Sequence, residues 1–216
     1  MSFELPPLLK QETARNGETV FTVDGRSLVS SFDPSKEAQA WALKALAQIA
    51  DRTSAIIIGA ACGYHIKALK NLRSDLAVLT IEASENIAAG VLDIHHDINA
   101  SDIIVAMTPM ELTNSLKFRD FIIGRFAILT HPAQALMRDA WTSELTQFLT
   151  GRDSLAFLMQ LRMRPELYAL FDEEKIAALA GQQSPISILT IRNLFKAEAK
   201  ASRERRIWRV LEELVV

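Results

Sequence analysis

Short apolar, β-branched runs alternate along the chain with stretches that have helical spacing. Four runs are almost entirely apolar, which is typical of strands in a parallel sheet covered on both faces. They are residues 55–58, 76–81, 103–107 and 126–130. Because each run is followed by a stretch with helical spacing, we expect right-handed crossovers between neighbouring parallel strands. The pattern therefore predicts a three-layer, Rossmann-like α/β domain.

The stretch before the first of these runs has the signals of a helix start. Asp33 can cap the helix, Pro34 suits its first position, and Glu37 complements the helix dipole. Apolar residues then recur at helical spacing: Ala38, Trp41, Ala42, Ala45, Leu46 and Ile49. Further helices are expected from residue 63 or 64 to residue 72, over 86–92 and over 111–121.

The N-terminal region has a different pattern. Residues 1–15 are expected to be a poorly fixed leader, since Pro6 and Pro7 resist helix formation. Residues 18–31 then predict a β-hairpin, because alternating β-formers surround Asp24-Gly25, a strong hairpin-turn signal. The simplest role for this hairpin is to cover an edge of the main sheet.

The pattern changes again toward the C-terminus. Helices are expected over 135–150, 154–170, 173–180 and 197–214, whereas the β-branched run 185–194 could be a strand. The predicted Rossmann-like domain spans 16–150, and a helical C-terminal extension spans 151–216.

Composition narrows the classes of function. The chain has 216 residues, 49% of them hydrophobic, which is enough for one good core. Its net charge of -2 does not favour nucleic acid or an anionic membrane as a partner. The single cysteine suits a reducing cytosol, and the N-terminus lacks the pattern of a signal peptide. We therefore expect a cytoplasmic protein without a membrane-spanning segment.

The candidate chemistry lies at the end of the first parallel strand. Gly59, Ala60, Ala61 and Gly63 let the backbone turn sharply, and the helix that follows starts with N–H groups that favour an anion. About twenty residues on, an acid ends the next strand, where dinucleotide folds place the acceptor of a ribose hydroxyl. The pattern G-A-A-C-G differs from G-x-G-x-x-G, because alanine replaces the middle glycine. The predicted ligand contacts are Gly59, Ala60, Cys62, Gly63, Tyr64, His65 and Glu82.

Two segments together resemble the N-terminal domain of the motility-associated factor proteins. They are RSLVSSFDPSKEAQAWA and IIIGAACGYHIKAL, the second followed by LTIEAS. The family's hairpin, serine, aspartate-proline and glutamate match Asp24, Gly25, Ser30 or Ser31, Asp33, Pro34 and Glu37. Its glycine-tyrosine-histidine turn matches Gly63, Tyr64 and His65, its later acid matches Glu82, and His131-Pro132 is also similar. The match covers roughly residues 15–140.

The resemblance implies a Rossmann-like domain associated with glycosylation. Members of this family are flagellin glycosyltransferases thought to transfer nonulosonic acids, such as pseudaminic acid, from a CMP donor. Their transferase activity is assigned to a larger domain that follows this one, whereas here a short helical tail follows. We therefore expect no glycosyl transfer by this chain alone.

Two classes of function stand on this basis. The first is a nucleotide- or nucleotide-sugar-binding module that works with a protein partner of a bacterial glycosylation system. The second is an S-adenosylmethionine-dependent small-molecule methyltransferase, in which Glu82 would hold ribose and Asp97 adenine. Against the second, four parallel strands are fewer than that fold normally uses. A scaffold without a ligand is a third option, and the sequence assigns neither a catalytic residue nor a cofactor.

Other chemically active residues have simpler explanations. Cys62 and His65 could form a nucleophilic pair, but a small residue in a tight turn beside a surface imidazole is favoured. His95 and His96 with Asp93 and Asp97 lack the spacing of a metal site, and a solvated loop is favoured. A basic cluster near the C-terminus is best explained as a solvated helix face: Arg203, Arg205, Arg206 and Arg209. No metal site is predicted.

Overall fold

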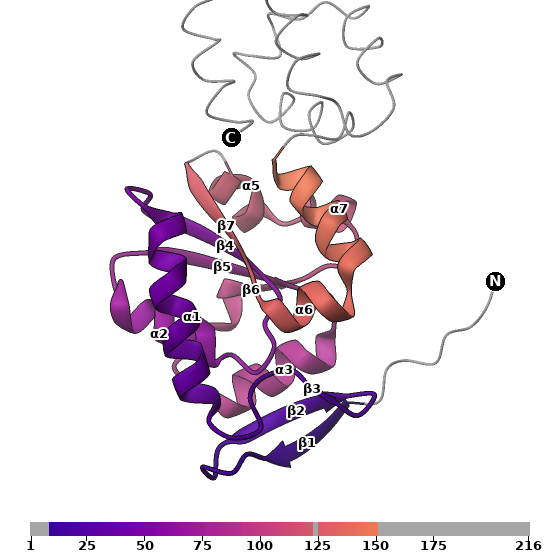
Figure 1. The fold of residues 1–216 in the computed structure, drawn as a ribbon. Coiled ribbons are helices and arrows are strands. Elements are labelled where there is room, and N and C mark those ends of the chain that lie inside the picture. The colour runs from indigo at the N-terminus through magenta and orange to yellow at the C-terminus, as the bar shows by residue number, and fades with distance from the viewer. Residues whose placement is uncertain (1–8, 123–124, 151–216) are drawn as a thin grey trace, which may run out of the picture. The chain divides into compact units, whose positions relative to one another are not determined.

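A parallel sheet forms the centre of the fold (Figure 1). The computed structural model describes residues 9–122 and 125–150. Within them the sheet has the strand order β6-β5-β4-β7, with every pair parallel. Its strands are β4 (Ser54–Ile58), β5 (Ala77–Glu82), β6 (Ile103–Val105) and β7 (Phe126–Thr130). The predicted Rossmann-like α/β fold, with its four parallel strands, is confirmed.

Strand β4 lies in the middle of this sheet and is buried on both faces. Ile56 pairs with Leu79 of β5 on one side and Ile128 of β7 on the other. Successive side chains of a strand point to opposite faces, so Ile57 packs in one layer while Ile56 and Ile58 pack in the other. This double burial explains why the run is continuously apolar rather than alternating.

Helices α1 (Pro34–Ile49) and α2 (Tyr64–Leu72) pack against each other beside the sheet (Figure 1). The start of α1 follows the prediction, because the Asp33 carboxylate accepts a hydrogen bond from Lys36 N at 2.9 Å and Pro34 begins the helix. The buried face of α1 consists largely of small residues: Ala38, Ala42, Ala45 and Ile49. Such residues let the helix approach its neighbours closely.

The remaining described helices are α3 (Glu85–Ile94), the 3-10 turn η1 (Ala100–Asp102), α4 (Pro109–Leu112), α5 (Leu116–Ile122), α6 (Pro132–Met137) and α7 (Asp139–Leu149). The helix predicted over 111–121 is split in two. Ser115 starts the second part, where its hydroxyl accepts from Phe118 N at 3.2 Å. The helix predicted over 135–150 is likewise divided, into α6 and α7.

The N-terminal strands form a separate antiparallel sheet, called the small sheet below. It consists of β1 (Leu9–Thr13), β2 (Thr19–Val23) and β3 (Arg26–Ser27) in the order β1-β2-β3. The hairpin at Asp24-Gly25 is confirmed, although its return strand is shorter than predicted. One expectation was wrong, because residues 9–13 are a paired strand rather than part of a leader. The hairpin belongs to this small sheet and does not pair with the main sheet.

Other predictions concern residues outside the described ranges. They are the helices over 154–170, 173–180 and 197–214, the run 185–194, the C-terminal arginine cluster and most of the leader. The chain divides into two compact units after Thr142, and the site described below belongs to the first. Within residues 9–122 and 125–150, no helix is long and apolar enough to cross a membrane.

Candidate functional site

The turn after β4, residues 59–63, is as sharp as the sequence predicted. Gly59 and Gly63 have φ angles of 95° and 80°, and Ala61 has 44°, all in the left-handed region. Yet the turn is closed rather than open to a ligand, since all five of its residues are buried. Part of the cover comes from the small sheet, because Phe21 N donates to the Cys62 sulfur at 3.2 Å and the Tyr64 hydroxyl donates to Thr19 O at 2.9 Å.

Glu82, at the end of β5, is 0% exposed. Its carboxylate accepts hydrogen bonds from Ala60 N and Ala83 N, each at 2.8 Å, and from Ser84 N at 3.0 Å. Burial raises the pKa of this carboxyl, and the backbone donors act in the opposite direction. Glu82 therefore connects the turn after β4 to the start of α3. The ribose-binding role predicted for it stays a prediction.

Protein atoms also occupy the space beside Gly63. A Cβ there would lie 2.6 Å from Cδ2 of His95 and 2.8 Å from a methyl group of Val91. The His95 ring is held by a hydrogen bond between Nε2 and Cys62 O at 2.9 Å, so the solvated loop expected for this histidine is wrong.

Burial raises the pKa of the Cys62 thiol to about 12, which removes its nucleophilic character at neutral pH.

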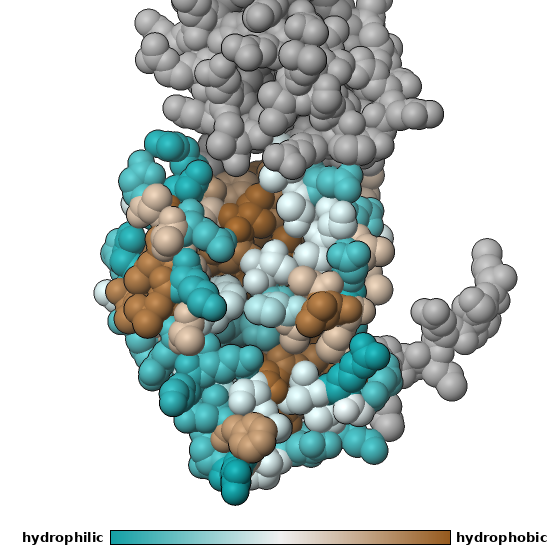
Figure 2. Space-filling model, viewed as in Figure 1, coloured by the Kyte–Doolittle hydropathy of each residue, from teal (hydrophilic) through white to brown (hydrophobic). Residues whose placement is uncertain are grey.

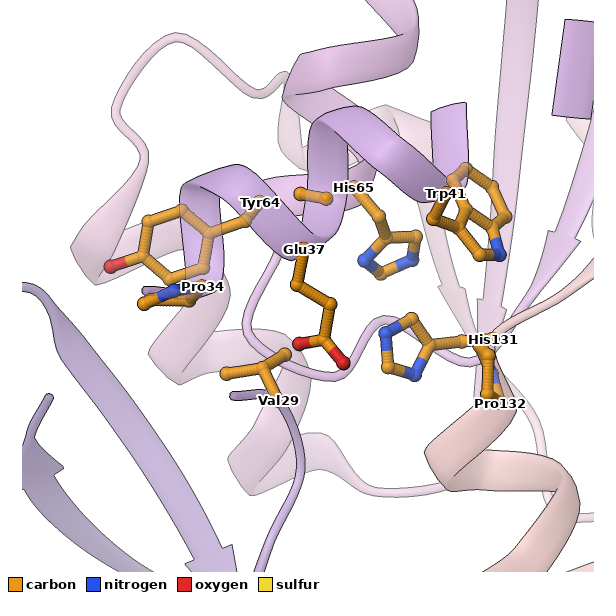
Figure 3. Close-up of a pocket in the computed structure, with 9 residues that line it drawn as sticks. Val29, Pro34, Glu37, Trp41, Tyr64, His65, His131 and Pro132 are labelled. Atoms are coloured by element: carbon orange, nitrogen blue, oxygen red, sulfur yellow. The ribbon is translucent and has the colours of Figure 1, made fainter. Parts of the chain in front are cut away.

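A crevice opens on the other side of β4. It lies where α1, the start of α2 and the end of β7 meet, and its volume is about 30 Å³ (Figure 3). We call it the switch-point crevice, because the chain order of the sheet reverses between β4 and β7. Open α/β sheets bind ligands outside the carboxyl ends of their strands at such a point. Its lining residues are Val29, Pro34, Glu37, Ala38, Trp41, Tyr64, His65, His131 and Pro132.

His65 reaches the crevice from the first turn of α2 and is 1% exposed, so the surface imidazole expected at this position is wrong. Its Nε2 lies 3.1 Å from the carbonyl oxygen of Gly59, whereas its Nδ1 is buried without a hydrogen-bond partner. Burial and the neighbouring His131 hold the pKa of His65 well below its usual value, so the ring is neutral at pH 7. A carbonyl oxygen only accepts, so the ring proton is on Nε2 and Nδ1 presents a bare lone pair.

His131 reaches the same space from the end of β7 and is 5% exposed. Its backbone N donates to Ile58 O at 3.0 Å, which extends the β4–β7 ladder by one residue. The His65 and His131 rings lie 4.4 Å apart between centroids, and Nδ1 of His131 is also buried without a partner. Burial lowers the pKa of His131 to about 4. The crevice thus holds two neutral imidazoles with unsatisfied nitrogens.

Helix α1 supplies the rest of the polar and aromatic lining. The Trp41 ring packs edge-on against His65 at 5.1 Å between centroids, and its N–H lies 3.4 Å from Thr130 O. Figure 3 shows Glu37 extending toward the two imidazoles. Its exposed carboxylate accepts from Ser30 N at 2.5 Å. Glu37 therefore has both the helix-start position predicted for it and a place at the crevice.

A larger open groove of about 300 Å³ lies between α1 and α2. Figure 2 shows apolar surface over these helices, and the exposed side chains of Leu43 and Leu72 contribute to it. The polar groups of this groove, among them Gln39 and Lys67, are largely accessible to water. Water can therefore satisfy the polar groups of the groove, whereas the imidazole nitrogens of the crevice are buried and unpaired.

The described residues contain no group of three or more His, Cys, Asp or Glu side chains placed to hold a metal ion. The acidic and histidine residues near position 95 are separated by the fold. His95 is buried against the closed turn, His96 is exposed, and Asp97 pairs with Lys67 at 3.0 Å.

No protein-family model, curated protein or solved structure matches this chain. The resemblance to the motility-associated factor proteins therefore rests on the motifs alone. Of the predicted ligand contacts, Tyr64 and His65 line the crevice, whereas Gly59, Ala60, Cys62, Gly63 and Glu82 belong to the closed turn and its supports. Trp41 was predicted only as a core residue of α1.

Proposed function

We propose that this chain is a nucleotide- or nucleotide-sugar-binding module whose ligand enters the switch-point crevice. The observation that carries this proposal is the pair of buried, unpaired imidazole nitrogens of His65 and His131 at the carboxyl edge of the sheet. Buried polar atoms in native proteins nearly always have a partner, and leaving one unpaired costs roughly 1–3 kcal/mol. A bound group that reaches these nitrogens would recover that free energy.

The lining also has the composition of a ligand site. Small-molecule pockets are mostly apolar and aromatic, with a few polar groups that converge on one place. Here Trp41, Val29 and the prolines supply the apolar walls, and the two imidazoles with Glu37 supply the polar groups. A volume of about 30 Å³ holds one small group rather than a whole nucleotide, so the remainder of the ligand would lie outside.

The alternative, a methyltransferase, is supported less well. It needs Glu82 to accept ribose hydroxyls, but three backbone N–H groups already occupy this buried carboxylate. It also needs an open turn at residues 59–63, which are buried. Binding without its own chemistry fits the motif resemblance, since the transferase activity of that family is assigned to a different domain.

A ligand screen by thermal unfolding of the full chain tests this function. CMP, UDP, CMP-sugars and S-adenosylmethionine are the probes, with His131→Gln as the crevice variant and His96→Gln, at an exposed position, as its control. A ligand at about 100 times its Kd adds about 2.7 kcal/mol to stability, which raises Tm by roughly 5–10 °C for a chain of this size. We expect a nucleotide or nucleotide sugar to stabilise the parent and His96→Gln equally, and His131→Gln less.

Two results would contradict the proposal. One is that no nucleotide or nucleotide sugar raises Tm at millimolar concentration. The other is that S-adenosylmethionine alone does so, with an effect that depends on Glu82 and not on His131, which would support the methyltransferase.

A further inference from the structure

We propose that the switch-point crevice binds a neutral hydroxyl group, donated to Nδ1 of His65, and therefore holds the sugar end of the ligand rather than its phosphates. This inference rests on the proposed function for the identity of the whole ligand. Its own basis is the hydrogen-bonding character of the crevice, which follows from the geometry of one residue.

The fold decides what His65 offers to a ligand. Its Nε2 is 3.1 Å from Gly59 O, so the neutral ring keeps its proton there. Nδ1 is then an acceptor only, and it is buried with no partner. Nδ1 of His65 therefore selects a hydrogen-bond donor, because an acceptor placed against it would leave both lone pairs unsatisfied.

The surrounding charges point in the same direction. The described lining residues include no lysine or arginine, and the one charged side chain, Glu37, is an anion at the edge of the crevice. A phosphate or carboxylate would meet the Glu37 carboxylate and the bare lone pair of His65, both of which repel it. A sugar hydroxyl can donate to either group, and the Trp41 ring offers an apolar surface to the sugar's C–H groups.

A buried water is the simplest competing occupant. The crevice volume of about 30 Å³ is enough for one water, and a water could donate to His65. The two occupants differ in a measurable way, because only a sugar-binding crevice makes a nucleotide sugar bind more tightly than the same nucleotide without its sugar.

Two substitutions of His65 separate ligand binding from structural support. In His65→Gln the amide nitrogen takes the place of Nε2, so the bond to Gly59 O is kept while the acceptor at Nδ1 is lost. In His65→Asn the amide oxygen lies near the place of Nδ1, so the acceptor is kept while the bond to Gly59 O is lost. The exposed His96→Gln serves as the matched control.

The experiment measures affinity by calorimetry for UDP and UDP-glucose, CMP and a CMP-sugar, and free glucose and N-acetylglucosamine. We expect the parent to bind a nucleotide sugar more tightly than its nucleotide. His65→Gln should lower only the affinity for the nucleotide sugar, by about tenfold, while His65→Asn keeps the preference despite a lower Tm.

The outcomes distinguish this inference from the proposed function. One outcome is that each nucleotide sugar binds no more tightly than its nucleotide, both in the parent and in His65→Gln. Nucleotide binding would then stand, but the sugar assignment would be overturned in favour of a buried water. Binding of free sugars that depends on His65, without binding of any nucleotide, would support the sugar assignment and reject the nucleotide. Loss of the preference in His65→Asn but not in His65→Gln would also overturn it, because the role of His65 would then be structural.

Discussion

The carboxyl end of β4 has two neighbours, and they differ in how their polar groups are satisfied. On the β5 side, in the closed turn, the Glu82 carboxylate accepts from Ala60, Ala83 and Ser84. On the β7 side, in the switch-point crevice, His65 and His131 each have a buried nitrogen without a partner. Both places have the fold position of a ligand site, but only the second has hydrogen-bonding capacity left for a ligand. A strand-end acid is therefore weak evidence for binding until its partners are known.

The largest effect is expected from Glu82→Ala. The substitution leaves three backbone N–H groups without their acceptor in a buried place, so we expect a loss of about 3–5 kcal/mol in the free energy of unfolding. Urea denaturation measures it. Glu85→Ala removes an exposed acid from the first turn of α3 and should change stability little. If Glu82→Ala is as stable as the parent but binds nucleotide more weakly, Glu82 binds the ribose as the sequence predicted. The ligand site would then be the turn after β4 rather than the crevice.

The next effect concerns the crevice and pH. His131 has a pKa of about 4 in the fold and about 6.5 when unfolded, so the unfolded chain binds more protons between these values. Because of this histidine, the free energy of unfolding falls by about 3 kcal/mol as pH decreases from 6.5 toward 4, and it does not change above pH 6.5. Urea denaturation at several pH values between about 7.5 and 4 measures the slope, which is the change in the free energy of unfolding with pH.

His131→Gln should flatten that slope, and His96→Gln should leave it as it is. Part of the slope should remain in His131→Gln, because the pKa of His65 is lowered by burial in the same direction. An identical slope in His131→Gln and the parent would mean that His131 is accessible to water in the folded protein. Its nitrogen would then not lack a partner, and the crevice would not differ from the closed turn in this respect.

A somewhat smaller effect is expected from Gly63→Ala in the closed turn. The φ angle of 80° is unfavourable for alanine, and the added methyl group would meet His95 and Val91, so we expect a loss of about 2–3 kcal/mol. Gly25→Ala is the matched control, since it has φ 76° and nothing within 4 Å, and should lose about 1 kcal/mol. Thermal unfolding compares them. Equal losses would show that the packing against Gly63 is loose and that the turn has room for a ligand.

The sequence predicted the elements whose signals are local. The β-branched run of β4, the turn at Asp24-Gly25 and the cap at Asp33 all carry their cause within a few residues. Strand β1 was missed because most of its side chains are exposed and polar, so backbone pairing with β2 holds it rather than an apolar pattern.

The site was predictable only in part, for the same reason. Spacing correctly located Glu82 at the end of a strand, but its role depends on which backbone N–H groups face it. The meeting of His65 and His131 depends on β4 and β7 being neighbours, although these histidines are 66 positions apart in sequence. One signal was present: each follows the end of a predicted strand closely, and adjacent parallel strands place such residues at one edge.

The smallest effect is expected from Tyr64→Phe, which tests how the closed turn is kept closed. The Tyr64 hydroxyl donates to Thr19 O across the boundary between α2 and the small sheet, and losing this bond should lower stability by about 1 kcal/mol. Amide hydrogen exchange of β2 should become faster than that of β4, because the small sheet can then open by itself. Thr22→Val is the control, since the hydroxyl of Thr22 bonds to Glu12 within the small sheet. If β2 and β4 exchange faster by the same factor in Tyr64→Phe, the small sheet is no separate cover, and the turn after β4 is closed by the core itself.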